Sequence, residues 1–238
     1  MMNAARSGFD RTLEAIEAKI IELFGIVAED LPAVTQAFLD GRGDMATALA
    51  QREQFVDALY RQVEELAGRE LLLQAPVASD LRFLLSVLRI APELERSHDL
   101  VMQLASHVGA SLAEDLTPAA RDLARRMGDL ASAMWRQAAD SWYDRNRSAA
   151  SALAGQQEEM TALLASLAAE LASGRTAIPA TMRMTLVGRC YERLGAHALN
   201  IARRVTYLAG GRGLCPCEAQ DGKDPAEQVC ELSNSRAA

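Results

Sequence analysis

Residues 94–105 read LERSHDLVMQLA, and residues 191–202 read YERLGAHALNIA. In both segments an apolar or aromatic residue precedes a Glu-Arg pair, and both segments end in an apolar residue followed by Ala. Glu95 and Glu192 lie 97 positions apart, as do the two final alanines. A match at a constant offset predicts a duplicated structural unit.

Around this repeat, apolar residues recur every three or four positions, which is the spacing of one face of a helix. The six periodic segments are 9–38, 46–73, 81–108, 123–142, 153–171 and 182–208. We expect Leu73 to belong to the apolar face of the second segment, and Met182 and Leu186 to that of the sixth. Half of the 238 residues are hydrophobic but only 5% are aromatic, and there are 7 prolines and 15 glycines, a composition that favours helices over sheets.

Prolines, glycines and capping residues predict where these helices begin and end. Pro32 should kink or restart the first helix, and Pro92 should bend the third. The expected boundaries are a turn at Gly41–Asp44 with Asp44 as N-cap, helix starts at Pro76 and Thr117-Pro118, an end near Gly109, a polar turn at 144–147, a break at 174–179 and a stop at Gly210-Gly211.

Six helices of this length need neighbours to cover their apolar faces. The short connections favour antiparallel packing. We therefore predict an all-α protein of two tandem three-helix bundles with six long helices, at residues 6–110 and 117–211. Residues 212–238 are polar and acidic and should form a flexible C-terminal tail.

Charge and cysteine content restrict the class of protein. The net charge is −7 and no basic cluster is present, which argues against nucleic-acid binding. Three of the four cysteines lie near the C-terminus, at Cys215, Cys217 and Cys230, and are incidental thiols or an incomplete zinc site.

The N-terminus has no basic segment followed by an apolar run, and no apolar run approaches roughly 20 residues. A cytoplasmic protein that meets membranes only through partners is expected.

Two pairs of carboxylates stand out because each is spaced by one helical turn. Glu53 and Asp57 lie in the second helix, and Glu95 and Asp99 lie in the third. If these helices are antiparallel neighbours, the four side chains could converge on a hard cation such as magnesium, manganese, calcium or iron. The alternative is a solvated face on which the acids pair with neighbouring arginines, Arg52 and Arg96. The spacing alone leaves both open.

The histidines and Cys190 add no catalytic centre. His98 falls on the apolar face of the third helix, where a packing role is expected, and Cys190 should be a small core residue. Glu95 and His98 have the Glu-x-x-His spacing of di-iron bundles, but no second copy exists, since His197 stands five residues after Glu192. No phosphate-binding glycine loop or nucleophile elbow is present, so we expect no enzyme.

Several motifs resemble the PhoU family of phosphate-uptake regulators. Residues 74–82 read QAPVASDLR and precede Leu88-Arg89-Ile90, and residues 94–99 read LERSHD, similar to the family's Pro-x-Ala-x-Asp-Leu-Arg and Leu-Glu-Arg-Ile-Gly-Asp. Residues 191–202 resemble the family's second motif, Glu-Arg-x-Gly-Asp-His-Ala-x-Asn-Ile-Ala. The resemblance spans residues 9–211 and implies two three-helix bundles in one elongated molecule.

The resemblance also implies metal binding. Family members bind metal clusters through Glu/Asp-x-x-x-Asp pairs on two helices of each repeat, and the first repeat matches with Glu53/Asp57 and Glu95/Asp99. The second repeat has Ala196 in place of Asp99 and lacks the acidic pair near Gln157 and Thr161, so only Glu192 remains. We expect at most one metal site, of magnesium, manganese or iron, in the first bundle.

The function implied by the resemblance is that of an adaptor. Such proteins repress the phosphate-starvation response and restrain uptake by linking the ATPase subunit of the phosphate importer to a sensor histidine kinase, and a homodimer is expected. Asp80, Arg82, Arg96 and Glu192 match family motifs and have either a contact role or a structural one. The competing interpretations are a di-iron metalloprotein and a helical scaffold that binds no metal.

Overall fold

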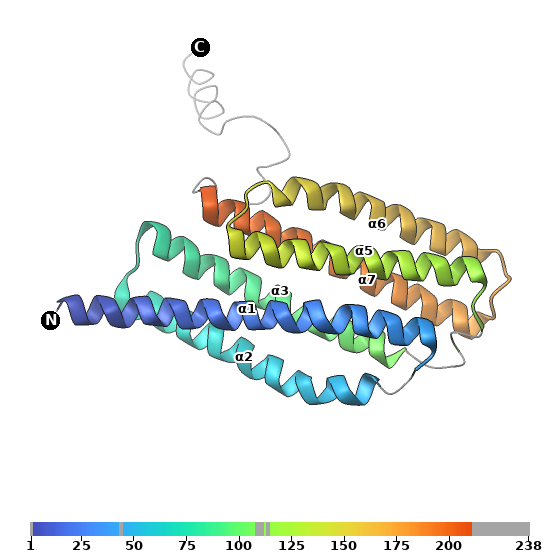
Figure 1. Cartoon of the computed structure of the whole chain (residues 1–238), viewed down its shortest axis with the longest axis horizontal. Helices are drawn as coiled ribbons and strands as arrows, with labels where there is room; N and C mark the ends of the chain where they lie inside the picture. The colour runs from blue at the N-terminus through green and yellow to red at the C-terminus, as the bar shows by residue number, and fades with distance from the viewer. Residues whose placement is uncertain (1, 43–44, 108–111, 113–114, 211–238) are drawn as a thin grey trace, which may run out of the picture.

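Six long helices form the described part of the chain, and this part contains no strand (Figure 1). The computed structural model describes residues 2–42, 45–107, 112 and 115–210. The helices are α1 (Met2–Asp40), α2 (Met45–Gln74), α3 (Ala78–Ser106), α5 (Pro118–Asp144), α6 (Ala149–Ala172) and α7 (Ile178–Gly210). The predicted all-α fold is confirmed. The N-cap at Asp44, the end near Gly109, the stop at Gly211 and the tail at 212–238 fall outside the described residues.

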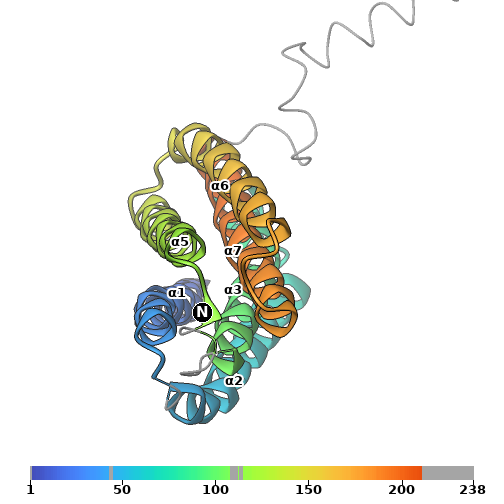
Figure 2. The same cartoon turned by 90° about the vertical axis from the view of Figure 1, so that its right-hand side faces the viewer.

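The helices form two three-helix bundles that lie side by side. α1, α2 and α3 pack on one another, and so do α5, α6 and α7. Contacts between α1 and α5 and between α3 and α7 join the bundles, so that α2 and α6 lie at opposite outer edges (Figure 2). No described helix is both long enough and apolar enough to cross a membrane.

The boundaries of α5 follow local rules. Thr117 Oγ1 accepts a hydrogen bond from the backbone N–H of Ala120 at 3.1 Å, and Pro118 occupies the first helical position, as predicted. The helix ends at Asp144, and Arg145 adopts a left-handed conformation with φ of 53°. The polar turn expected here is present.

The expected start of α3 at Pro76 is wrong, because this helix begins at Ala78. The chain reverses direction between α2 and α3 over residues 75–77 only. Ala75 and Ala78 take positive φ values of 42° and 50°, so Pro76 belongs to the reversal and not to the helix.

Of the two effects expected of Pro32, a kink or a restart of the helix, the restart does not occur, since α1 continues through Pro32, as α3 continues through Pro92. A proline inside a helix removes one backbone hydrogen bond. Leu31 and Val34, on both sides of Pro32, are fully buried, and this packing holds the helix together. α7 begins at Ile178, earlier than the expected break allows.

Three apolar residues expected in the core are exposed. Leu73 lies at the end of α2, and Met182 and Leu186 lie in the first half of α7. The buried face of α7 instead carries Met184 and Val187 and continues through Tyr191. The helical period expected for the start of α7 was right, but the buried face is that of Met184 and Val187 and not that of Met182 and Leu186.

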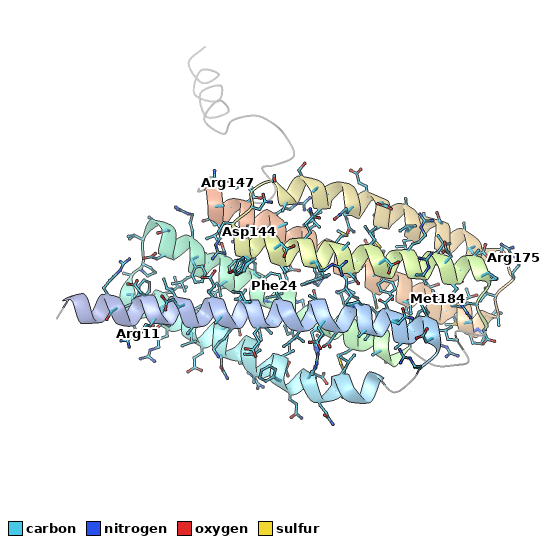
Figure 3. All side chains as sticks on the ribbon, viewed as in Figure 1. Arg11, Phe24, Asp144, Arg147, Arg175 and Met184 are labelled. Atoms are coloured by element: carbon cyan, nitrogen blue, oxygen red, sulfur yellow. The ribbon has the colours of Figure 1, made fainter. Side chains whose placement is uncertain are left out.

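Aromatic residues fill the core between the bundles. Phe24 of α1 meets Trp135 and Trp142 of α5, with ring centroids 6.2 and 6.4 Å apart, and its position can be followed in Figure 3. Trp135 Nε1 donates a hydrogen bond to the carbonyl oxygen of Leu194 in α7 at 3.0 Å. Both tryptophans are fully buried. The bundles therefore share one hydrophobic core.

Candidate functional site

The hairpin of α2 and α3 brings three of the four predicted ligands into one electrostatic group. Glu95 is half-buried on α3. Burial raises the pKa of its carboxyl group, the charges of Asp99 and Asp57 raise it further, and Arg96 opposes them. Carboxylates that repel one another favour a bound cation, because a cation removes their repulsion.

A fourth acid, Glu64, belongs to this group although the sequence analysis missed it. Its charge also raises the pKa of Glu95. Tyr60 hydrogen-bonds to Glu64, and this bond, with burial and the charges of Glu64 and Glu95, raises the Tyr60 pKa to about 12. Glu64 stands seven residues after Asp57, two helical turns along the same face. A search for the seven-residue spacing would have found it.

Glu53 stands apart from these acids. Its side chain is exposed, and no contact links it to Asp57, Glu95 or Asp99 in the part of the chain that the structure describes. Over the same residues, no three Asp, Glu, His or Cys side chains stand close enough to enclose a metal ion. The carboxylates thus form an open, half-exposed group of oxygen donors that a hard cation and water could complete.

Arg52 does not serve the carboxylate pairs, contrary to the possibility considered from the sequence. Its guanidinium instead pairs with the buried carboxylate of Asp30 on α1 and, at 3.3 Å, with Glu29. Burial raises the pKa of Asp30, and Arg52 opposes this rise. The arginine thus stabilises the packing of α1 against α2 and leaves the acids of the hairpin without its charge.

His98 is buried on the packed face of α3, as predicted, with 1% of its surface exposed. Its Nε2 lies 3.8 Å from Asp30 Oδ2, and neither atom has a hydrogen-bond partner among the described residues. Burial lowers the pKa of His98, and the nearby charge of Asp99 partly offsets this by raising it. The imidazole therefore faces an acid of α1, whereas the di-iron interpretation needs it on a metal shared with a second Glu-x-x-His.

The equivalent place in the second bundle holds no group of carboxylates. Glu192 pairs with Arg189 on its own helix at 3.3 Å, and its carbonyl oxygen accepts a hydrogen bond from Gln157 Nε2 at 3.3 Å. Ala196 stands where α3 has Asp99. Within the described chain, the carboxylate group on the α2–α3 hairpin therefore has no counterpart in the second bundle.

Asp80 and Arg82 lie at the other end of α3, about 20 Å or more from Glu95 along an axis that rises about 1.5 Å per residue. Asp80 occupies the first turn, where its charge suits the helix dipole, and Arg6 Nη2 lies 3.4 Å from its Oδ2. The Nε of Arg82 is buried without a hydrogen-bond partner among the described residues. Asp80 also borders a cavity of about 320 Å³ that reaches Arg145. This motif is separate from the carboxylate group.

A known family model matches this chain in two segments, one in each bundle. The PhoU domain model aligns with residues 20–108 and 124–205, which is most of the chain. This chain belongs to the PhoU domain family. The two matched segments coincide with the two bundles, and the PhoU motifs at Asp80 and Glu95 fall in the first of them.

Curated PhoU relatives align over nearly their whole length. A phosphate-specific transport system accessory protein PhoU homolog of Synechocystis is 28% identical over 226 residues, covering 88% of this chain and 95% of the relative. A homolog of the same description from Rhizobium meliloti is 29% identical over 213 residues, covering 86% and 88%.

Two solved PhoU structures share the fold. The crystal structure of PhoU from Pseudomonas aeruginosa superimposes with a TM-score of 0.79 at 24% identity, covering 86% of this chain and 100% of that one. The PhoU structure from Streptococcus pneumoniae gives a TM-score of 0.75 at 23% identity, covering 86% and 98%.

Proposed function

We propose that this PhoU-family chain is an accessory protein of a phosphate-specific transport system that restrains phosphate uptake and represses the phosphate-starvation response. It acts as an adaptor without catalytic activity, between the ATPase subunit of the importer and a sensor histidine kinase. In this proposal it works in the cytoplasm as a homodimer and meets the membrane only through these partners. The observation that carries the proposal is the family match over both bundles, together with relatives that are named as accessory proteins of such a system.

The carboxylate group on the α2–α3 hairpin supplies the second part of the proposal. Once their side chains close on it, Asp57, Glu95 and Asp99 would hold a magnesium, manganese or iron ion through oxygen atoms, with water as further ligands and Glu64 nearby. The ion would neutralise a patch of repelling carboxylates and fix side chains of α2, at the outer edge of the first bundle, to side chains of α3. A metal at this place would shape a surface for protein contact and would not activate a substrate.

The test is a binding measurement with the purified full chain, an importer ATPase subunit and the cytoplasmic part of a sensor kinase, with manganese or with chelator. We expect binding to both partners, and weaker binding after chelation or in the variant Glu95→Gln/Asp99→Asn. Glu53→Gln is the matched control, because Glu53 is exposed and stands outside the group, and it should bind as the wild type does.

Two results would contradict parts of this proposal differently. If neither partner binds and deletion of the gene leaves phosphate-responsive expression unchanged, the adaptor role is wrong. If both partners bind equally well with manganese and with chelator, and the wild type carries no more metal than the double variant, the scaffold works without metal.

A further inference from the structure

A small groove lies where α3 of the first bundle meets α7 of the second. Its cavity measures about 220 Å³, and three arginines line it: Arg89 from α3, and Arg203 and Arg204 from α7. Ile90 and Ile201, both buried, form part of its wall.

Arg204 is the unusual member, because only 7% of its surface is exposed. Its guanidinium lies over the ring of Tyr207, 5.1 Å from the centroid. Burial lowers the pKa of Arg204, and the charge of Arg89 lowers it further. Among the described residues, no carboxylate lies within ion-pair distance of Arg204. A buried cation in such surroundings favours an anion, because a desolvated charge is costly unless it is paired.

The single acid in the lining is already engaged. Glu93 Oε2 lies 3.3 Å from His197 Nδ1, and the backbone carbonyl of Glu93 accepts a hydrogen bond from Ser97 Oγ at 2.6 Å. Arg203 and Arg204 follow each other on α7 and bring two positive charges to the groove against this one acid, although the whole chain carries a net charge of −7. This local reversal of charge would attract small anions.

We propose that this groove binds a phosphate group, either as inorganic phosphate or as the end of a small phosphomonoester, with Arg204 as its buried cation and Arg203 at its rim. Arginine presents a planar fork of donors that matches phosphate oxygens, and several arginines suit an anion of more than one charge. Asn200, also in the lining, can add an amide donor. The cavity is smaller than the roughly 300 Å³ at which pockets for drug-sized ligands begin, which favours a small ligand.

The position of the groove gives the binding a structural effect. The groove is lined by residues of α3 and α7, which belong to different bundles, so a bound phosphate would lie in the seam between the two halves of the molecule. The proposal does not depend on the adaptor role, nor on a metal at the α2–α3 hairpin. It adds a ligand for the seam between the bundles.

The experiment is equilibrium dialysis of the full chain, first freed of metals with chelator so that phosphate cannot bind through a cation. The probes are inorganic phosphate, glycerol 3-phosphate and, as a carboxylate of single charge, acetate. We compare the wild type with Arg204→Gln and with Arg203→Gln, which removes an exposed charge and should leave folding intact. Arg193→Gln removes an exposed arginine from the same helix outside the groove and is the control.

We expect one saturable phosphate site per chain, with an affinity about tenfold or more weaker in Arg203→Gln and Arg204→Gln and unchanged in Arg193→Gln. Binding of inorganic phosphate identifies the free ion as the ligand, and binding of glycerol 3-phosphate alone identifies a monoester. The proposal is overturned if neither probe binds saturably, if acetate binds as tightly as phosphate, or if Arg203→Gln binds as the wild type does. Circular dichroism establishes that each variant is folded, and if Arg204→Gln is not, Arg203→Gln decides.

Discussion

Thr35 Oγ1 lies 3.0 Å from Tyr191 Oη, and this hydrogen bond joins α1 of the first bundle to α7 of the second. Thr35 also donates to the carbonyl oxygen of Leu31 at 2.9 Å, so its single hydroxyl hydrogen is already used and Tyr191 is the donor. Tyr191 is fully buried, and burial raises the pKa of its phenol, which therefore keeps its proton. The bond is a polar link inside an apolar seam.

Tyr191→Phe should lower the free energy of unfolding by about 1 kcal/mol, because one net hydrogen bond is lost while the ring still fills its site. Urea unfolding followed by circular dichroism measures the change. Tyr143→Phe is the control, since Tyr143 is exposed and its loss of a hydroxyl should change stability little. Equal stability of Tyr191→Phe and wild type would show that the bond contributes nothing.

Gly128→Ala should destabilise the protein by roughly 1–3 kcal/mol through overpacking. A Cβ at this position on α5 would lie 2.3 Å from Thr35 Cγ2, the same threonine that holds Tyr191. Gly155→Ala on α6 meets open space and should instead stabilise its helix by up to about 1 kcal/mol. Adding Thr35→Ser removes the clashing methyl group and should recover part of the loss, and a strictly additive double variant would contradict this account.

Arg52→Met should destabilise the protein by about 2 kcal/mol, because Asp30 then stays buried without its charged partner. The double variant Asp30→Asn/Arg52→Met should recover most of this loss, since no unpaired charge remains. Glu29→Gln is the control: Glu29 is exposed and its pair with Arg52 should be worth well under about 1 kcal/mol. A double variant as unstable as the sum of its single changes would argue against the pair.

Glu95→Gln should stabilise the metal-free protein at neutral pH, because it removes the repulsion between Glu95 and each neighbouring carboxylate. Each repulsion removed should add a few tenths of a kcal/mol, on the order of that for a like-charge pair one helical turn apart. The pKa of Glu95 is raised in the folded state. Between the ordinary pKa of a glutamate and the raised pKa of Glu95, the folded chain therefore holds more protons than the unfolded chain. The stability of the wild type falls as pH rises through this range. Below about pH 4 both states hold the proton and the advantage of the variant should disappear.

Manganese should reverse that order, because it binds the wild-type carboxylates and raises the wild-type melting temperature more than that of Glu95→Gln. Thermal unfolding with manganese and with chelator gives both values, and Glu53→Gln is the matched control. If Glu95→Gln destabilises the metal-free protein at neutral pH, the carboxylates are not a repelling group.

Much of the fold can be predicted from the sequence because the buried face of each helix requires apolar residues every three or four positions. Thr117 and Pro118 predict the start of α5 from local chemistry alone. The start of α3 depends on how tightly the chain reverses at Ala75 and Ala78, which no periodicity encodes. The first half of α7 has apolar residues on two faces, those of Met182 and of Met184, and only the packed neighbours decide which face is buried.

The candidate site was predictable where its residues share a helix or, like Asp57 and Glu95, lie on two helices that follow each other in the chain. The pair Glu95 and Asp99 could be found from its spacing, but the partner of Arg52 is Asp30 on another helix, and a single sequence without a fold does not reveal such a pair. The contact between α3 and α7 likewise depends on tertiary packing. The sequence therefore does not predict that Arg89, Arg203 and Arg204 line one groove.

The two tryptophans of the chain, Trp135 and Trp142, both lie on α5 and both face Phe24 across the seam between the bundles. Because no other residue type emits at the same wavelengths with comparable strength, the intrinsic fluorescence of the protein comes from this seam alone. Both indoles are shielded from water. Any event that parts the bundles and exposes these indoles to water would shift their emission to the red, so the protein carries its own optical reporter of the opening of this seam.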